Sequence, residues 1–177
     1  MRPGYLSARI PVSQPRAGFL LTRHWRDTPQ GTELSFWLAT DDGPLQVTLP
    51  PQESVAFIPE AQRAQAERLL QGEKGLRFAP LALKDFHRQP IVGLYCRAHR
   101  QLMRLEKMLR DSGVTVYEGD IRPPERYLME RFITAPVWVE GETRGSQLVN
   151  ARMKPNPDYR PPLKWVSLDI ETTRHGE

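Results

Sequence analysis

The last apolar run of the chain carries two carboxylates at a spacing that suits metal chemistry. In WVSLDIE (165–171) the even-numbered residues are apolar, and the odd-numbered residues include Asp169 and Glu171. Alternate residues of a β-strand point to the same face, so this pattern predicts a strand with one packed face and one open face. Asp169 and Glu171 would project together from the open face, with Cα atoms about 7 Å apart.

Two carboxylates this close repel each other unless a cation lies between them. Mg²⁺ and similar hard cations prefer carboxylate oxygens, and two such ions can activate a water and stabilise the leaving oxygen in phosphodiester hydrolysis. Asp169 and Glu171 are therefore candidate catalytic residues and candidate ligands of Mg²⁺ or Mn²⁺. The alternative is a solvated strand end without chemistry. A two-metal site needs further acidic ligands, so we expect the chain to be a fragment cut inside a second domain.

A second pattern that suits nucleic-acid binding lies in HRQLMRLEKMLRDSG (99–113), which has the periodicity of an amphipathic helix. Leucines form one stripe and cations form another, and a row of cations at helical spacing can follow a phosphate backbone. A solvated helix face is the alternative. Further cations precede the C-terminal run. The candidate nucleic-acid contacts are Arg97, Arg100, Arg104, Lys107, Arg122 and Lys164.

The elements that position these residues predict an α+β fold. Residues 17–49 indicate an antiparallel β-meander, with turn residues DDGP before its last strand. The following segments read β-α-β-β-α-β, the order of ferredoxin-like folds and RNA-binding modules. The expected elements of this unit are the strand 54–58, helix 59–72, strands 75–83 and 90–98, helix 99–113 and strand 114–120.

The chain changes character after Asp120. A short helix at 121–133, two strands within 135–154 and a proline-rich extended segment at 155–162 precede the carboxylate pair. The predicted organisation is a mobile leader (1–16), a first domain (17–120) and the beginning of a second domain (121–177).

Composition limits the classes of function. A net charge of +4 permits contact with nucleic acid, and 39% hydrophobic with 26% charged residues is typical of a soluble globular protein. The single cysteine excludes an internal disulfide and a cysteine-based metal site. No apolar stretch approaches the ~20 residues of a membrane span, so we expect a cytoplasmic protein without membrane contact.

The motif VSLDIETT resembles the first exonuclease motif of family B DNA polymerases, whose core is D-I-E-T. Upstream, RPPERYLMERFI resembles the helix that leads into their exonuclease domain, and DYRPPLKWVSLDIETTRHGE fits the bacterial branch. The resemblance extends from Gly18 to Glu177.

The resemblance implies a DNA-directed DNA polymerase, a nucleotidyltransferase of DNA replication and repair, with a 3′–5′ proofreading exonuclease of RNase H-like fold. Asp169 and Glu171 match two ligands of its divalent ions, and the remaining ligands belong to later motifs. By this resemblance residues 17–120 form the polymerase N-terminal domain, which helps to hold primer-template and single-stranded DNA, and residues 121–177 begin the exonuclease domain.

The resemblance also implies a nucleoid-associated enzyme that meets a sliding clamp through parts absent here, and a fragment that is inactive alone. Two other interpretations remain open from the residues: a stand-alone nucleic-acid-binding adaptor without catalysis, and a small self-sufficient metallonuclease.

Overall fold

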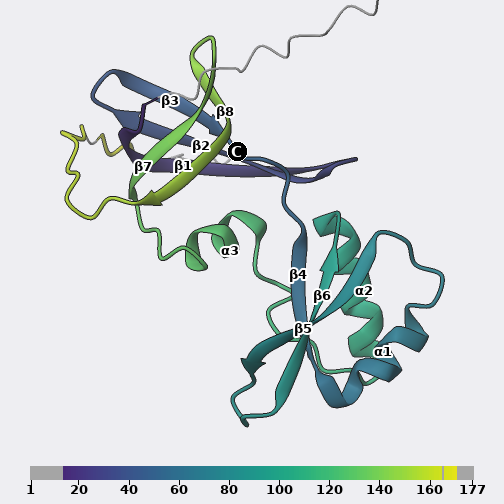
Figure 1. Ribbon diagram of the computed structural model, residues 1–177. Helices are drawn as coiled ribbons and strands as arrows, with labels where there is room; N and C mark the ends of the chain where they lie inside the picture. The colour runs from purple at the N-terminus through teal and green to yellow at the C-terminus, as the bar shows by residue number, and fades with distance from the viewer. Residues whose placement is uncertain (1–13, 165, 171–177) are drawn as a thin grey trace, which may run out of the picture.

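The computed structural model describes residues 14–164 and 166–170, which form two units with a short helix near their junction (Figure 1). The first unit is a β-barrel, and the second is a small sheet with helices packed on it. The fold is therefore α+β and mostly strands, as the sequence predicts. The barrel strands are β1 (Arg16–Thr28), β2 (Gly31–Thr40), β3 (Gly43–Thr48), β7 (Pro136–Arg144) and β8 (Gln147–Pro155).

The barrel is closed in the order β1-β2-β3-β8-β7. Neighbouring strands are antiparallel except β3 and β8, which pair in parallel through Gln46–Gln147 and Val47–Leu148. The sequence predicted an open meander from residues 17–49, and instead β7 and β8 close it. Residues 136–155 thus pair with β1 and β3, which corrects the expectation that everything after residue 120 lies in another domain.

Burial in the barrel follows the period-two pattern of its strands. Along β2, Leu34, Phe36 and Leu38 are buried, whereas Trp37 between them is exposed. The helix α3 (Pro123–Met129) adds Tyr127 to the same core, and the Tyr127 hydroxyl accepts the Met153 N–H at 3.4 Å. The common core explains why β7 and β8 belong with β1–β3: burying their apolar faces elsewhere would leave the barrel open.

The second unit is inserted between β3 and α3. Its three strands lie in the order β4-β6-β5 and are antiparallel, and its helices pack on one face. One stripe of α2 is buried against the sheet through Leu102, Leu105 and Leu109. The elements are β4 (Ser54–Pro59), the 3₁₀ turn η1 (Glu60–Gln62), α1 (Arg63–Leu69), β5 (Leu76–Lys84), β6 (Pro90–Cys96) and α2 (His99–Asp111).

The last strand predicted for this unit, 114–120, is reduced to a single bridge. Phe57 and Tyr117 exchange backbone hydrogen bonds of 3.0 and 2.8 Å beside β4. Glu118 then takes a φ of 56°, in the left-handed region, so the chain turns away and the pairing stops. The prediction of a full strand here was wrong.

The strand predicted at the carboxylate pair is also absent from the described residues. Residues 163, 164 and 166–170 have no regular secondary structure, and Val166, Leu168 and Ile170 are 81%, 87% and 85% exposed. A strand needs a neighbour for its backbone groups, and no strand within 14–164 pairs with this segment. The expected strand with a packed face is therefore wrong for these residues, and the expected first strands of an RNase H-like sheet stay a prediction.

Candidate nucleic-acid interface

The basic face of α2 carries less free charge than its sequence suggests. Arg104 is paired with Glu73 through two hydrogen bonds of 2.9 and 2.7 Å, and Lys107 is paired with Asp111 at 2.8 Å. Hydrogen bonding to Glu73 raises the pKa of Arg104, and hydrogen bonding to Asp111 raises the pKa of Lys107. Arg97 and Arg100 are exposed. Neither forms an ion pair with any residue that the structure describes, so these two cations are available to a phosphate.

The other two predicted cations lie on different segments. Arg122 directly precedes α3, and Lys164 lies on the chain that leaves β8 beside the barrel (Figure 1). That chain is held to the barrel where Tyr159 donates to Asp41 at 3.0 Å. The six basic residues therefore do not form one cluster: four share α2 or its N-terminal approach, and two are elsewhere.

A carboxylate of the barrel holds the N-terminus of α2. Asp27, on β1, accepts the backbone N–H of His99 and of Arg100, each at 2.9 Å, and the Thr32 hydroxyl at 2.8 Å. Ala98, at the N-cap position, supplies no side-chain cap, so Asp27 takes that role from the other unit. Burial raises the pKa of Asp27, but the hydrogen bonds from Arg100, His99 and Thr32 outweigh it, and the net pKa lies below its usual value.

His99 lies at the same junction. Its ring meets Trp25 edge-on with centroids 6.2 Å apart, and its Nδ1 is buried without a hydrogen-bond partner among the described residues. Burial lowers the pKa of His99, against the opposing charges of Asp27 and Glu106. The junction therefore favours a neutral imidazole.

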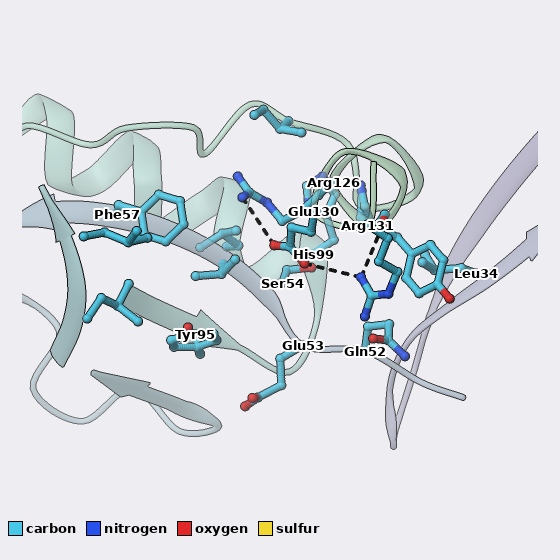
Figure 2. A pocket seen from close by; sticks show the side chains of 17 residues that line it. Leu34, Gln52, Glu53, Ser54, Phe57, Tyr95, His99, Arg126, Glu130 and Arg131 are labelled. Carbon is cyan, nitrogen blue, oxygen red and sulfur yellow. Dashed lines mark hydrogen bonds and ion pairs between the residues drawn. The ribbon is translucent and has the colours of Figure 1, made fainter. Parts of the chain in front are cut away.

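A cavity of about 270 Å³ lies between the barrel, α3 and the inserted sheet (Figure 2). Its lining combines the aromatic rings of Phe57, Tyr95 and Tyr127 with Arg126 and Arg131. The guanidinium of Arg126 stands over the Phe57 ring at 5.2 Å, and that of Arg131 stands over the Tyr127 ring at 3.9 Å.

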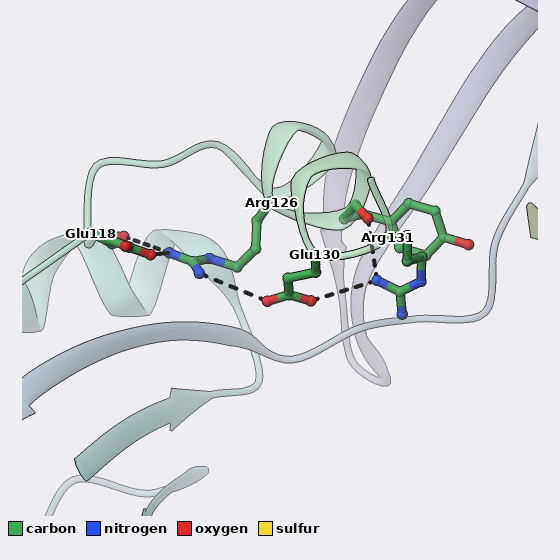
Figure 3. A network of polar contacts seen from close by, with 5 residues as sticks. Glu118, Arg126, Glu130 and Arg131 are labelled. Atoms are coloured by element: carbon green, nitrogen blue, oxygen red, sulfur yellow. Dashed lines mark hydrogen bonds and ion pairs between the residues drawn. The ribbon is translucent and has the colours of Figure 1, made fainter. Parts of the chain in front are cut away.

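The two arginines of this cavity are already paired with carboxylates (Figure 3). Arg126 contacts Glu118 at 3.1 Å and Glu130 at 3.7 Å, and Arg131 contacts Glu130 at 3.5 Å. Arg126 also donates to the Glu118 carbonyl at 3.0 Å. With their charges balanced, these side chains join α3 to the chain leaving the inserted sheet, and they offer little to an anionic ligand.

The predicted metal ligands are not assembled in the described part of the chain. Asp169 is exposed, and Glu171 lies outside the described residues. No group of three or more His, Cys, Asp or Glu side chains suited to a metal ion occurs among residues 14–164 and 166–170. One solvated carboxylate does not satisfy a Mg²⁺ ion, so Asp169 alone among the described residues does not form the site, and the site stays a prediction.

Three tryptophans of the barrel lie on its surface, where the sequence analysis placed no candidate site. Trp25, Trp37 and Trp138 are 39%, 40% and 38% exposed. A signal was present in ELSFWLAT, where Glu33 and Ser35 alternate with the buried apolar residues and share their side of the strand with Trp37. Trp165 lies outside the described residues.

Comparison with known families matches two successive parts of the chain. The model "DNA polymerase II, N-terminal" matches residues 18–53, and "DNA polymerase II, insertion domain" matches residues 54–114. Over 162 residues, 92% of this chain, the sequence is 77% identical to DNA polymerase II of Escherichia coli strain K12. The chain belongs to the DNA polymerase II family.

The resemblance to family B polymerases that the sequence suggested is thus confirmed. The chain spans 21% of the length of the E. coli DNA polymerase II that it matches. The border between the two DNA polymerase II models, at residues 53 and 54, falls where the barrel gives way to β4. What the sequence analysis treated as one N-terminal domain, 17–120, therefore spans part of the barrel and a separate inserted unit.

A solved structure shares this architecture. The family B DNA polymerase from the hyperthermophilic archaeon Pyrobaculum calidifontis superposes with a TM-score of 0.59 and 16% sequence identity, over 83% of this chain and 21% of that one. At this identity the likeness shows the fold alone. In the described residues, no helix has the length and apolarity to cross a membrane.

Proposed function

We propose that this chain is the N-terminal part of a DNA-directed DNA polymerase of family B that also carries a 3′–5′ proofreading exonuclease. The observation that carries the proposal is the 77% identity to E. coli DNA polymerase II over 162 residues. In the complete polymerase that contains this chain, the barrel and the inserted unit would supply surface that contacts primer-template and single-stranded DNA. The stand-alone adaptor interpretation is not favoured at such identity.

In the same proposal Asp169 and Glu171 are two of the ligands for the divalent ions of the exonuclease, Mg²⁺ or Mn²⁺. The ions would supply an activated water and charge stabilisation at the phosphodiester. The D-I-E-T motif supports this role, and the other ligands would come from later parts of the polymerase. Action in replication and repair, contact with a sliding clamp and a cytoplasmic, nucleoid-associated location belong to the same proposal.

The test of the polymerase activity uses the complete protein that contains this sequence. Purified protein, a 5′-labelled primer on a longer template, dNTPs and Mg²⁺ should give template-directed extension. Absence of extension, with a well-folded protein and a control polymerase active in the same buffer, would contradict the proposal.

The contribution of α2 is tested by salt-dependent DNA binding. Removing a cation that neutralises one phosphate reduces the slope of log K against log salt by about 0.7–0.9. Because Arg97 and Arg100 have no ion-pair partner in the described structure, the double change Arg97→Ala with Arg100→Ala should weaken binding and flatten that slope. Lys107→Ala, which removes a cation already paired with Asp111, is the matched control and should change the slope less. Equal slopes in all three proteins would remove α2 from the DNA surface.

A further inference from the structure

The order of the barrel strands points to a binding surface that the exonuclease and the basic helix do not use. When the five barrel strands are numbered 1 to 5 along the chain, β7 is strand 4 and β8 is strand 5, and their order around the barrel is 1-2-3-5-4. Strands 3 and 5 are parallel, and α3 precedes strand 4. Five-stranded barrels of this Greek-key type bind oligonucleotides across strands 2 and 3, between the loops joining strands 1–2 and 4–5. Topology alone does not give function, so the surface itself must carry the argument.

That surface holds a shallow open groove of about 290 Å³ on the outside of the barrel. The strand register places the lining side chains, together with Trp37 beside them, in two rows. His24 on β1 lies opposite Ser35 on β2, which lies opposite Thr48 on β3. In the next row, Trp37 lies opposite Gln46, which pairs in the β3–β8 register with Gln147.

The two loops that the topology indicates join strand ends close to lining residues of the groove: Arg26 and Glu33 near one loop, and Gln147 next to the other. The β1–β2 turn follows Thr28, whose hydroxyl donates to the Gly31 carbonyl at 2.8 Å. The β7–β8 turn lies between Arg144 and Gln147, and Gly145 takes a φ of 58° there. Both turns are two residues long, so neither extends far enough to cover the surface between them.

The groove lining has the chemistry that unpaired nucleotides need. Hydroxyl and amide groups of Ser35, Thr48, Gln46 and Gln147 can donate to and accept from base edges and sugars. Trp25 is the aromatic residue of the lining itself. Beside the lining, opposite Gln46, the Trp37 indole is 40% exposed on the same face as Ser35 and offers a ring on which a base can stack. Stacking needs an unpaired base with a free face, so the surface fits single strands and not duplex DNA.

Charge on the groove complements a phosphate backbone. Arg26 is held at 2.7 Å by Glu33, yet 74% of its side chain stays exposed. At the other end Arg144 is exposed and forms no ion pair within the described residues. Arg26 therefore lines the groove, and Arg144 lies beside it, opposite Gln147 in the β7–β8 register. Glu33, already paired, is the acid that lines the groove.

We propose that the groove across β1, β2, β3 and β8 binds single-stranded DNA, with a base stacked on Trp37 and the backbone running between Arg26 and Arg144. This inference rests on the proposed role of the chain in DNA handling and names the surface that would perform it. It adds a binding track on the barrel that does not use the exonuclease motif and that adjoins the N-terminus of α2 at Trp25 and Arg26.

The test measures binding of fluorescein-labelled oligo(dT) of 12 nucleotides to this chain by anisotropy at low salt, with duplex DNA of the same length as the comparison. Trp37→Ala should raise the Kd for oligo(dT) roughly fivefold to a hundredfold, the range expected for loss of one stacked base. Trp37→Phe should restore part of the affinity. Gln46→Ala provides a second variant without an aromatic change, and it should also weaken binding.

Trp138→Ala is the matched control, because Trp138 is 38% exposed on β7, outside the groove. It should bind as the unaltered chain does. Equal affinity of Trp37→Ala and the unaltered chain, or loss of binding in Trp138→Ala alone, would overturn the groove while leaving the polymerase proposal intact. Tighter binding to duplex than to single strand would also overturn it. Failure of primer extension by the complete protein is a separate result, and it would contradict the polymerase proposal instead.

Discussion

The junction between the barrel and the inserted unit should depend on one carboxylate. In Asp27→Ala, the Arg100 N–H loses its acceptor and the His99 N–H keeps only the Thr32 hydroxyl, at 3.2 Å. The Thr32 hydroxyl in turn loses its acceptor and keeps only the Ser54 hydroxyl, at 3.4 Å. An N-cap is worth ~0.5–2 kcal/mol and a hydrogen bond to a charged group ~1.5–3 kcal/mol. Since the site is only part-buried, we expect a loss of about 2 kcal/mol in the free energy of unfolding.

The geometry also predicts an order among variants. Oδ1 of Asp27 accepts from His99 and Thr32, and Oδ2 accepts from Arg100. Asp27→Asn keeps one oxygen but places an NH₂ group against an N–H, so it should lose one bond, about 1 kcal/mol. Asp27→Ala loses all three, and for a chain of this size its melting temperature should fall by about 4–8 °C.

Urea unfolding followed by circular dichroism measures both variants, with Asp42→Ala in the exposed β2–β3 turn as control. The folded-state pKa of Asp27 is depressed, so its contribution is present above its unfolded pKa, near 3.8, and is lost as the pH falls through the folded value. The difference between Asp27→Ala and the unaltered chain should therefore shrink below about pH 4. A stability of Asp27→Ala equal to that of Asp42→Ala, or an Asn variant weaker than the Ala variant, would refute the interdomain cap.

Two further changes test the same junction. Burial lowers the folded-state pKa of His99, so the unfolded chain binds the extra proton and the free energy of unfolding should fall as the pH drops below the usual value of 6.5. In His99→Gln, urea unfolding should show a shallower dependence of stability on pH between 7 and 5. An unchanged dependence would contradict burial of the neutral ring. Arg126→Ala removes a side chain that is only 12% exposed, leaves Glu118 without its partner and leaves Glu130 with Arg131 alone. The free energy of unfolding in urea should therefore fall by about 1–2 kcal/mol, whereas Arg152→Ala, exposed on β8, should change it little.

Local patterns in the sequence predicted most elements because each was encoded within a few residues. The alternation in ELSFWLAT defines β2, and the leucine stripe of 99–113 defines α2. What could not be predicted was pairing between distant segments. Nothing in residues 135–154 states that β7 will pair with β1, a separation of more than a hundred residues, so the barrel was taken for an open meander.

The site predictions failed or stayed open for a related reason. Charge periodicity along α2 is visible in the sequence, but the partner of Arg104 is Glu73, thirty-one residues away on the loop before β5. The cap of α2 comes from Asp27, seventy-two residues before His99. The carboxylate pair was assigned from a local motif, and residues 166–170 pair with no strand of the described structure. The motif could therefore name candidate ligands, but it could not predict which strands would lie beside them.

The most direct test of the central claim is degradation of a 5′-labelled single strand from its 3′ end by the complete protein, with Asp169→Ala compared against Asp158→Ala. Asp158 is an exposed carboxylate of the same segment with no proposed role, which makes it a matched control. The account predicts that Asp169→Ala abolishes degradation while primer extension persists, and that Asp158→Ala changes neither activity. Full 3′–5′ degradation by the Asp169→Ala protein would contradict it.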